Sequence, residues 1–368
     1  MLRSSGGLWC AVALASAVTA YGQPDCGVAL TEKDVQIVRD RQAAGLYGEA
    51  DRAAGPGPSI VPLTIHVVRR SDGSGGVAEP LIADAIAECD VAFASLGLSF
   101  CQAGPTTHID HDGYYDQIDT LAEANMLRLI DFVPNTINVY FVDALSIGAG
   151  PLCGLASFTF NSAQGVIIRN GCMTTAADRT TLAHEIGHYF DLFHTHETAF
   201  GEECADSSNC ETAGDLVCDT PADPQLTRDM VSDECTYIGH ASDPCNGAPY
   251  APDPTNLMTY GRRECRNHFS SEQRGRALAT IRNFRRGLLR VECPDPCAPY
   301  ARCDVNCDGI ISNFDIDAFV LALSDPAGYT LAYPWCARLC TTDVNGDAVV
   351  DNRDILAFTD CLANLAQP

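Results

Sequence analysis

The sequence predicts an α+β fold with one β-sheet, followed by a small α-helical module, and three observations support this prediction. Strand-like and helix-like segments alternate between residues 60 and 290. Hydrophobic residues make up 46% of the 368 residues and charged residues 19%, which is sufficient for a buried core. The pattern "DVNCDGIISNFDIDAFVLAL", which begins at Asp304, recurs in a related form at Asp343, so a repeated unit follows the main domain.

The segments of the main domain are distinguished by their hydrophobic periodicity. Runs rich in β-branched residues predict strands at residues 60–69, 135–142, 154–160 and 165–169. Apolar residues at helical spacing predict helices at residues 79–96, 180–193 and 269–290. A further helix is expected at residues 31–44, with Thr31 as its N-cap, in a segment that ends at the Gly/Pro-rich residues 55–58.

The first residues and the cysteine content indicate a secreted protein. Arg3 is followed by an apolar run at residues 8–18 and then by small residues, which is typical of a signal peptide removed after Ala20 or Gly22. The run is too short for a transmembrane helix. Removal of Cys10 with the signal leaves 18 of the 19 cysteines in a compartment where disulfides form. The formal net charge of −25 excludes nucleic acid as a partner, and an extracellular or cell-surface location is expected.

The strongest chemical signal is the segment "HEIGHYFDLFH", which begins at His184. His188 lies four residues further along a predicted helix, on the same face, so the two imidazoles can bind one metal ion. Glu185 is placed to accept a proton from a water molecule on that metal. His194 offers a third imidazole, and three neutral imidazoles with one open position are typical of a catalytic zinc site. His196 is close enough in sequence to lie next to the metal ligands, but His194 has the better spacing for the third ligand.

This segment resembles the zinc-binding motif of the metzincins, and three further segments resemble the pappalysin (cytophagalysin) family of metzincin zinc metalloproteases. They are "GDLVCDTP" at residues 214–221, "NLMTY" at 256–260 and "CRNHFSSEQ" at 265–273. The resemblance covers residues 60–290. It implies a metzincin catalytic domain in which a mixed sheet is combined with an active-site helix and a C-terminal helix.

The resemblance also implies roles for individual residues. Zinc would be bound by three histidines, His184, His188 and His194. Glu185 would be the general base and acid, and Met258 would form a hydrophobic floor beneath the metal. Tyr260 would approach the zinc or stabilise the tetrahedral intermediate, and the strand at residues 154–160 would pair with an extended substrate.

One position departs from the family pattern, because the glycine in the middle of the motif is Asp191 here. The chain must turn at this position so that His194 reaches the metal. A left-handed backbone conformation is easiest for glycine but is tolerated by aspartate. We therefore expect Asp191 to adopt a positive φ angle.

Cys26, in "PDCGV" just after the signal, allows two interpretations. The family resemblance includes a Cys-Gly near the start of some zymogens, where the thiolate occupies the open zinc position, which makes Cys26 a latency candidate. Alternatively, Cys26 is part of one of nine disulfides. The even count of 18 cysteines favours this alternative, because an unbonded Cys26 would leave 17.

The acidic residues 202–253 also allow two interpretations. They resemble the calcium-stabilised loops of the family, with Asp215 and Asp219 as possible oxygen ligands, but a solvated acidic loop is equally consistent. Cys245 and Cys265 lie on either side of the methionine turn, the segment that contains Met258 and Tyr260. A disulfide between them would fix this turn, although connectivity cannot be deduced from sequence.

The C-terminal repeats match the spacing of EF-hand-like calcium loops. The matching ligand positions are Asp304, Asn306, Asp308 and Asp315 in the first loop, and Asp343, Asn345, Asp347 and Asp354 in the second. Aspartate at the last position resembles dockerin-type repeats, which implies a cohesin-like or cell-surface partner. Ala348 replaces the turn glycine Gly309 of the first loop, so the second site is expected to be weaker or strained.

These observations divide the chain into a signal peptide (1–22), a pro-segment (23–59), a metzincin-type zinc peptidase domain (60–291), a linker (292–302) and a dockerin-like calcium-binding module (303–368). The expected function is that of a secreted zinc endopeptidase, with Zn2+ and Ca2+ as cofactors, that hydrolyses protein or peptide substrates with Glu185 as general base. The alternative is a calcium-dependent extracellular binding protein with a degenerate zinc domain. The presence of Glu185 favours the enzyme.

Overall fold

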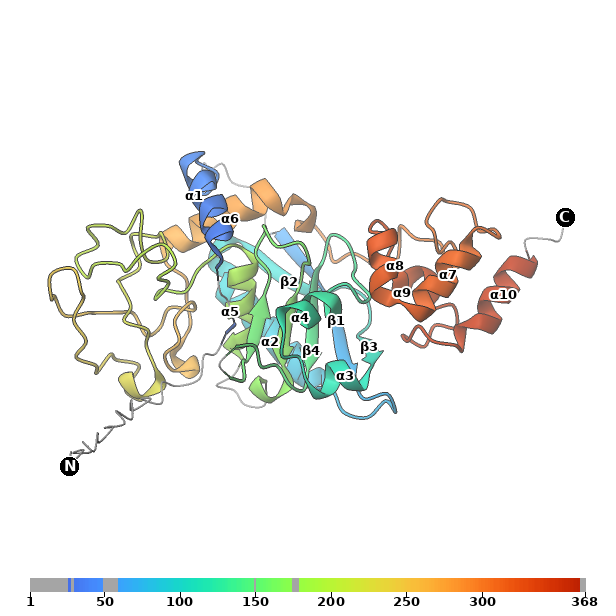
Figure 1. Ribbon diagram of the computed structural model, residues 1–368, viewed down its shortest axis with the longest axis horizontal. Helices are drawn as coiled ribbons and strands as arrows, with labels where there is room; N and C mark the ends of the chain where they lie inside the picture. The colour runs from blue at the N-terminus through green and yellow to red at the C-terminus, as the bar shows by residue number, and fades with distance from the viewer. Residues whose placement is uncertain (1–25, 28–29, 49–58, 149, 174–178, 365–368) are drawn as a thin grey trace, which may run out of the picture.

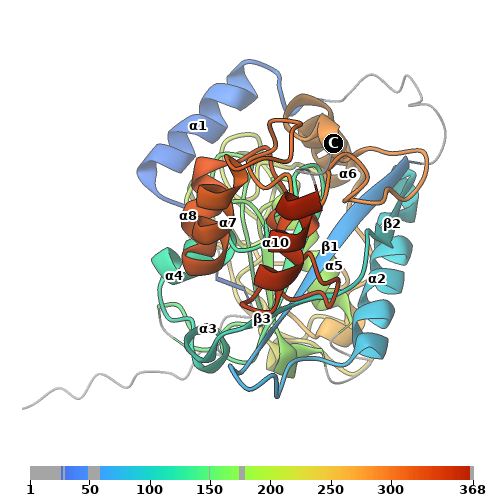
Figure 2. The same ribbon diagram turned by 90° about the vertical axis from the view of Figure 1, so that its right-hand side faces the viewer.

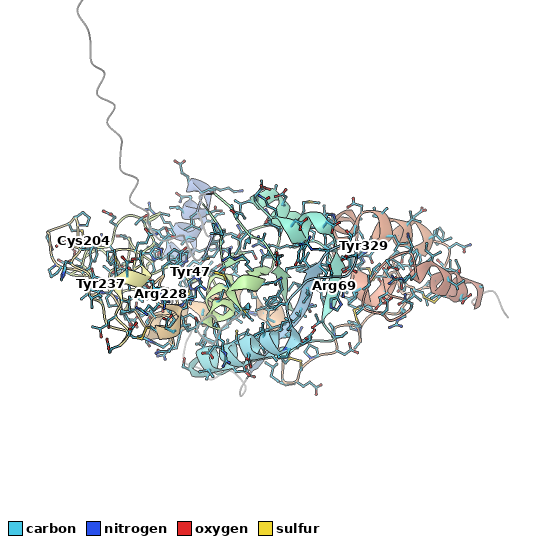
Figure 3. The ribbon with its side chains drawn as sticks, turned by 90° about the horizontal axis from the view of Figure 1, so that it is seen from below. Tyr47, Arg69, Cys204, Arg228, Tyr237 and Tyr329 are labelled. Atoms are coloured by element: carbon cyan, nitrogen blue, oxygen red, sulfur yellow. A yellow bond between two sulfur atoms is a disulfide. The ribbon has the colours of Figure 1, made fainter. Side chains whose placement is uncertain are left out.

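The computed structural model describes residues 26–27, 30–48, 59–148, 150–173 and 179–364 (Figure 1). A central body lies between a loop-rich region, residues 202–253, at one end and the C-terminal helices at the other (Figure 1). Figure 3 shows Cys204, Arg228 and Tyr237 in the loop-rich region and Tyr329 among the C-terminal helices. The expected signal peptide and the Gly/Pro-rich residues 55–58 lie outside the described residues. In the described ranges, every helix is too short or too polar to cross a membrane.

The central body is built on a sheet that has six strands within the described residues. The strands are β1 (Ser59–Arg69), β2 (Leu98–Gln102), β3 (Thr107–Asp110), β4 (Ile137–Val142), β5 (Gly154–Ala156) and β6 (Val166–Arg169). Their order is β2-β1-β4-β6-β5, and β3 also pairs with β1. All pairs are parallel except β5 with β6, which is antiparallel. The expectation of a mixed sheet is therefore confirmed.

Helices cover both faces of this sheet (Figure 2). They are α2 (Glu79–Phe93), α3 (Asp112–Asp116), α4 (Leu121–Leu127), α5 (Thr180–Tyr189) and α6 (Ser271–Phe284). Alternate strand residues point to opposite faces. Ile65 and Val139 are buried against α2, α5 and α6, whereas Val68 and Tyr140 are buried against α3 and α4. This packing places α5, which carries the first two histidines of the zinc motif, in the interior.

The predicted pre-segment helix is present as α1 (Glu32–Ala43). Thr31 is its N-cap, as expected, and forms a capping box with Asp34. The last turn of α1 meets the end of α6, where the guanidinium of Arg41 lies 4.0 Å from the ring centre of Phe284. Val38 of α1 is fully buried in an apolar cluster with residues of the central body.

Several predicted elements are shorter than expected. The strand predicted at 154–160 ends at Ala156, because the side chain of Asn161 accepts a hydrogen bond from the amide of Phe158 and turns the chain. The helix predicted at 180–193 ends at Tyr189 in a turn closed by the amide of Leu192 on the carbonyl of Gly187.

The remaining differences concern helix ends and short elements. The helix predicted at 269–290 is α6, which begins after the N-cap Ser270 and ends at Phe284. The helix predicted at 79–96 ends at Phe93 and continues as a 3-10 turn. The sequence analysis did not identify β2, β3, α3 or α4. Within the described residues, the 3-10 helices are Ala94–Leu96, Asn170–Cys172, Arg228–Met230, Arg263–Cys265 and Arg286–Leu288.

Eight disulfides stabilise the described residues. They are Cys101–Cys293, Cys153–Cys172, Cys204–Cys245, Cys210–Cys218, Cys235–Cys265, Cys297–Cys340, Cys303–Cys361 and Cys307–Cys336. The expected bond between Cys245 and Cys265 is wrong, because each of these cysteines has a partner on a different loop. Cys235–Cys265 nevertheless ties the loop-rich region to the segment just after the methionine turn.

The C-terminal module contains α7 (Asp315–Ser324), α8 (Pro326–Ala332), α9 (Arg338–Thr342) and α10 (Asp354–Asn364). The rings of Phe319 and Phe358, which occupy equivalent positions of the two repeats, stack at 3.9 Å. Arg338 forms a buried ion pair with Asp131 of the central body. The segment predicted as a linker is bonded near its start to the central body, through Cys101–Cys293, and at its middle to the C-terminal helices, through Cys297–Cys340.

Candidate active site

α5 orients two histidines towards one another. His184 and His188 lie one turn apart on a helix whose residues are all buried. Nδ1 of His184 lies 2.6 Å from the carbonyl oxygen of Leu257, and Nδ1 of His188 lies 2.8 Å from that of Leu192. A carbonyl oxygen only accepts hydrogen bonds, so both Nδ1 atoms carry the hydrogen and both Nε2 atoms present a lone pair.

His194 completes a group of three imidazoles. Nε2 of His188 lies 3.2 Å from Nε2 of His184 and 3.0 Å from Nε2 of His194. Lone pairs at this separation repel each other, whereas nitrogens bound to one tetrahedral zinc at about 2.0–2.1 Å lie about 3.3 Å apart. Burial lowers the pKa of all three histidines, that of His188 to about 3, so they remain neutral. The residues present therefore fit a zinc ion.

The sulfur of Cys26 belongs to the same cluster. The ligand atoms of Cys26, His184, His188 and His194 all lie within 4.8 Å of one another, and this is the only such group in the part of the chain that the structure describes. Cys26 takes part in none of the eight disulfides, so the disulfide interpretation is wrong. The parity argument failed because Cys89, buried in α2, is also outside every disulfide.

His196 lies beside this cluster but outside it. Its ring stacks on that of His194 with centroids 4.8 Å apart and packs against Tyr260 at 4.4 Å. It does not belong to the group of four ligand atoms. The geometry therefore favours His194 as the third imidazole ligand.

Glu185 is fully buried next to the cluster. Burial raises the pKa of its carboxyl to about 8, and the thiol of Cys26 donates a hydrogen bond to Oε2 at 3.4 Å. Strand β5 passes directly over the carboxyl group. A Cβ atom at Gly154 would lie 2.5 Å from Cγ of Glu185 and closer still to its carboxylate, so only glycine fits there.

Met258 lies beneath the histidine helix and is fully buried. A Cβ atom at Gly187 would lie 2.6 Å from its sulfur, so that glycine permits the close approach of helix and turn. The side chain of Asn256 accepts from the amide of Met258 at 2.8 Å and donates to Gln273 of α6 at 2.8 Å. The amide of Thr195 donates to the carbonyl of Met258 at 3.3 Å, which links the methionine turn to the third histidine.

Tyr260 projects towards the same cluster. Its ring packs against His194 at 4.5 Å, and its hydroxyl donates to the carbonyl oxygen of Cys26 at 2.6 Å. The hydroxyl is therefore placed to donate to a peptide oxygen that lies beside the histidines.

The chain around Cys26 occupies the edge of the sheet. Cys26 forms a parallel bridge with Gly154 of β5, and the amide of Gly27 donates to the carbonyl of Gly154 at 3.2 Å. A cavity of about 750 Å³ continues from Cys26 and Tyr260 into the loop-rich region. Its lining includes four acidic residues, Glu197, Glu202, Glu203 and Asp223. The edge of β5 that was expected to pair with a substrate is thus covered by residues 26–27.

Asp191, which stands where the family has glycine, has a φ of 58°, as expected. Its carboxylate is fully buried and accepts from the amide and the hydroxyl of Thr159 at 2.9 and 2.5 Å. It also accepts from the hydroxyl of Tyr47 at 2.9 Å and lies 3.4 Å from Arg41, and both of these residues lie in the segment that precedes β1.

The two C-terminal loops fold alike. Asp304 accepts from the amide of Gly309, and Asp343 accepts from that of Ala348, the equivalent position. The other expected ligands are Asn306, Asp308, Asp315, Asn345, Asp347 and Asp354, of which Asp315 and Asp354 are fully buried. Across residues 303–364 the carboxylates form no group close enough to mark an ion. Ala348 has a φ of 63°, so the expected strain at this position is confirmed.

The possible calcium ligands of the acidic loops, Asp215 and Asp219, belong to no cluster of metal-ligating side chains among the described residues. Asp219 caps α6 by accepting from the hydroxyl of Ser270 and the amide of Glu272. Asp215 is buried and accepts from Thr220, and burial raises its pKa well above the ordinary value, with Glu203 adding to the rise.

Proteins with similar sequences support the interpretation of this site as that of a metalloprotease. The profile of a peptidase family described as "Pregnancy-associated plasma protein-A" matches residues 134–282, which contain the three histidines, Glu185, Met258 and Tyr260. An extracellular metalloprotease of Colletotrichum graminicola is 29% identical over 286 residues, which cover 72% of this chain and 92% of the relative. Extracellular metalloprotease 1 of Coccidioides posadasii is 28% identical and covers 62% of this chain and 79% of its own length.

The fold has a counterpart among solved structures. Promirolysin of Tannerella forsythia has a TM-score of 0.50 and 16% identity, over 72% of this chain and 96% of its own. The family profile, the extracellular relatives and the fold together indicate a metalloendopeptidase.

Sequence reasoning did not identify several residues that shape the site. Gly154 and Gly187 have no side chain, and the signal they offer is a glycine within a strand or a helix. Arg41 and Tyr47 lie in the pro-segment, about 150 residues before Asp191, and nothing local to the zinc motif indicates that they contact it.

Proposed function

We propose that this chain is a secreted zinc endopeptidase of the pappalysin type that is made as a zymogen. The observation that carries the proposal is the buried cluster of His184, His188, His194 and Cys26 beside the carboxyl group of Glu185. Its extracellular location is supported by the relatives, whose printed names are extracellular metalloproteases. Peptides or proteins are the substrate class.

In the proposed reaction, each residue of the site has a separate role. His184, His188 and His194 would hold zinc, which supplies a Lewis acid that acidifies water and polarises a carbonyl when it is bound. Glu185 would take the proton from water and return it to the leaving amine, and its raised pKa suits a group that must both accept and donate a proton. Tyr260 would donate to the oxygen of the scissile carbonyl.

The pro-segment is proposed to keep the enzyme latent through Cys26. Its sulfur lies among the histidines, its backbone covers the edge of β5, and its carbonyl takes the hydroxyl of Tyr260. A thiolate there would fill the fourth ligand position, so water would be excluded. Cys26→Ser should give an unprocessed precursor that already hydrolyses peptide, because a hydroxyl is a far weaker zinc ligand.

For the C-terminal module we propose calcium binding and a dockerin-like docking role. The support is the repeated loop pattern and the matching course of both loops. A cohesin-like or cell-surface protein would be the partner. The alternative of a binding protein with a degenerate zinc domain is disfavoured, because Glu185 and the three histidines are all in place.

The test is casein hydrolysis by the processed protein with and without a zinc chelator. Glu185→Gln should abolish hydrolysis while zinc stays bound, because the amide keeps the shape but cannot accept a proton. Metal content is measured by mass spectrometry, and Glu264→Gln, an exposed change away from the cluster, is the control. Activity of Glu185→Gln near that of the parent would contradict the proposal.

A further inference from the structure

The pro-segment contacts the catalytic domain at two separate places. One is Cys26 at the histidine cluster. At the other, α1 and Tyr47 lie on a surface that we call the Asp191 site, formed by Thr159, Phe160, Asp191, Arg276 and Phe284. The second contact uses a residue that the zinc motif of the family does not have, since glycine stands there in the family.

The Asp191 site holds the guanidinium group of Arg41. Nη1 of Arg41 donates to the hydroxyl of Thr159 at 2.5 Å and lies 3.4 Å from Oδ2 of Asp191. Its Cζ atom lies 4.0 Å from the ring centre of Phe284 and 5.6 Å from that of Phe160. A buried carboxylate between aromatic faces is an arrangement that recognises a guanidinium through charge and through cation–π attraction.

The same site holds the phenol of Tyr47, which Figure 3 labels. The hydroxyl of Tyr47 donates to Oδ2 of Asp191 at 2.9 Å. The guanidinium of Arg276, on α6, lies 4.1 Å from the ring centre of Tyr47, and the ring of Phe284 lies 6.1 Å away. Two side chains of the pro-segment thus converge on one carboxylate oxygen, which is fully buried.

Apolar packing surrounds these polar contacts. Val38 and Tyr47 are buried in a cluster with Phe158, Phe193 and Phe200. Gln42 of α1 also donates to the carbonyl of Glu211, and Leu46 accepts from Asn283 of α6. If the pro-segment left, this apolar surface would face water, and Asp191 would lose two of its donors. Both effects favour keeping the segment bound.

We propose that the Asp191 site is a peptide-binding site, distinct from the zinc cleft, whose ligand is an arginine and a tyrosine presented by residues 31–47. It holds this segment on the catalytic domain by non-covalent contacts after the chain has been cut between residues 48 and 59. If the proposed latency is correct, the cut alone does not activate the enzyme, and activity begins only when the segment dissociates.

The experiment uses the full chain with the recognition sequence of a specific protease placed within residues 49–58. Cys26→Ser is included, so that the sulfur does not contribute to retention. After cutting, gel filtration and mass spectrometry measure the pro-segment that remains with the catalytic domain, and a fluorescent label on the segment gives its dissociation rate.

Three variants alter the Asp191 site, and one is the control. Arg41→Ala, Tyr47→Phe and Asp191→Gly should each speed dissociation by about tenfold or more, the usual effect of losing a hydrogen bond to a charged group. Asp191→Gly suits the positive φ at this position and restores the residue of the family, so the domain is expected to fold. Lys33→Ala removes a charge from an exposed position of the same helix and should leave the rate unchanged.

Retention in the Cys26→Ser parent and in Lys33→Ala, with faster release in the three site variants, supports the proposal. Equal retention in Asp191→Gly would overturn it, and so would immediate release from the Cys26→Ser parent. Because binding is measured without substrate, its outcome is independent of catalysis. A catalytic domain that holds the segment but never hydrolyses casein after its removal would refute the proposed function and leave the Asp191 site standing.

Discussion

Gly154→Ala is the substitution with which the structure can be tested most sharply. Gly154 lies on β5, directly over the carboxyl group of Glu185, and it also pairs with Cys26 of the pro-segment. An added Cβ would lie 2.5 Å from Cγ of Glu185. Carbon atoms in contact prefer about 3.5–4.0 Å, so the strand or the glutamate must move by about 1 Å.

Such a displacement should affect catalysis more than folding. A misplacement of about 1 Å in a reacting group can lower the rate by about a hundredfold, which corresponds to about 2.7 kcal/mol in the activation free energy. Adding a methyl group to a packed interior costs about 1–3 kcal/mol of unfolding free energy. The three heavy atoms nearest to the added Cβ all belong to Glu185 and none to a histidine, so zinc content should not change.

The assay is kcat/KM for a peptide substrate of the processed enzyme, together with zinc content and the thermal midpoint. Gly275→Ala is the matched control, because a Cβ at that position of α6 meets nothing within 4 Å. We expect the control to retain full activity. If Gly154→Ala has a kcat/KM within about threefold of the parent, the steric reasoning about Glu185 is wrong.

Three other changes test the metal ligands, the buried carboxyls and the contact between domains. His194→Ala should lose most of the bound zinc whereas His196→Ala should keep it, and equal zinc content in both would contradict the assignment. Burial raises the pKa of Glu203 from 4.5 to about 7. The contribution of this carboxyl to the unfolding free energy is therefore fully present below about pH 4.5 and is lost as the pH rises through 7. Glu203→Gln in calcium-free buffer should therefore raise the thermal midpoint at pH 8 and not at pH 4, and a rise at pH 4 alone would contradict this sign. Arg338→Ala should lower the unfolding free energy by about 3–5 kcal/mol, because Asp131 stays buried without its partner, and a loss below about 1 kcal/mol in denaturant titration would contradict the buried pair.

Local sequence signals predicted the elements that carry the chemistry. The β-branched run of β1 and the spacing of His184 and His188 depend only on nearby residues, and the structure has both. β2 and β3 were not identified, because they are short and pair with β1 from a distance along the chain. The end of α5 depends on the conformation of Asp191, which a search for apolar spacing does not detect.

The pairing of the cysteines could not be predicted from the sequence. The bond expected between Cys245 and Cys265 came from their position on either side of the methionine turn, but pairing depends on which loops meet in space. The parity argument for Cys26 failed for a related reason, since it assumed that every exported cysteine is bonded, and Cys89 is buried within the main core instead. A small, apolar thiol is stable in such a core without a disulfide partner.

Asp191 connects these observations to function. From the sequence, aspartate at position 191 of the motif looks merely tolerable. In the folded chain, Asp191 lies between the second and third histidines and contacts Tyr47 and Arg41. Its backbone amide donates to the carbonyl of His188 at 2.8 Å, and its carboxylate accepts from Tyr47. The residue that shapes the turn to the proposed third zinc ligand therefore also contacts the segment that precedes β1. The first role depends on the backbone of residue 191 and the second on its carboxylate, so Asp191→Gly should keep the turn while the pro-segment dissociates faster.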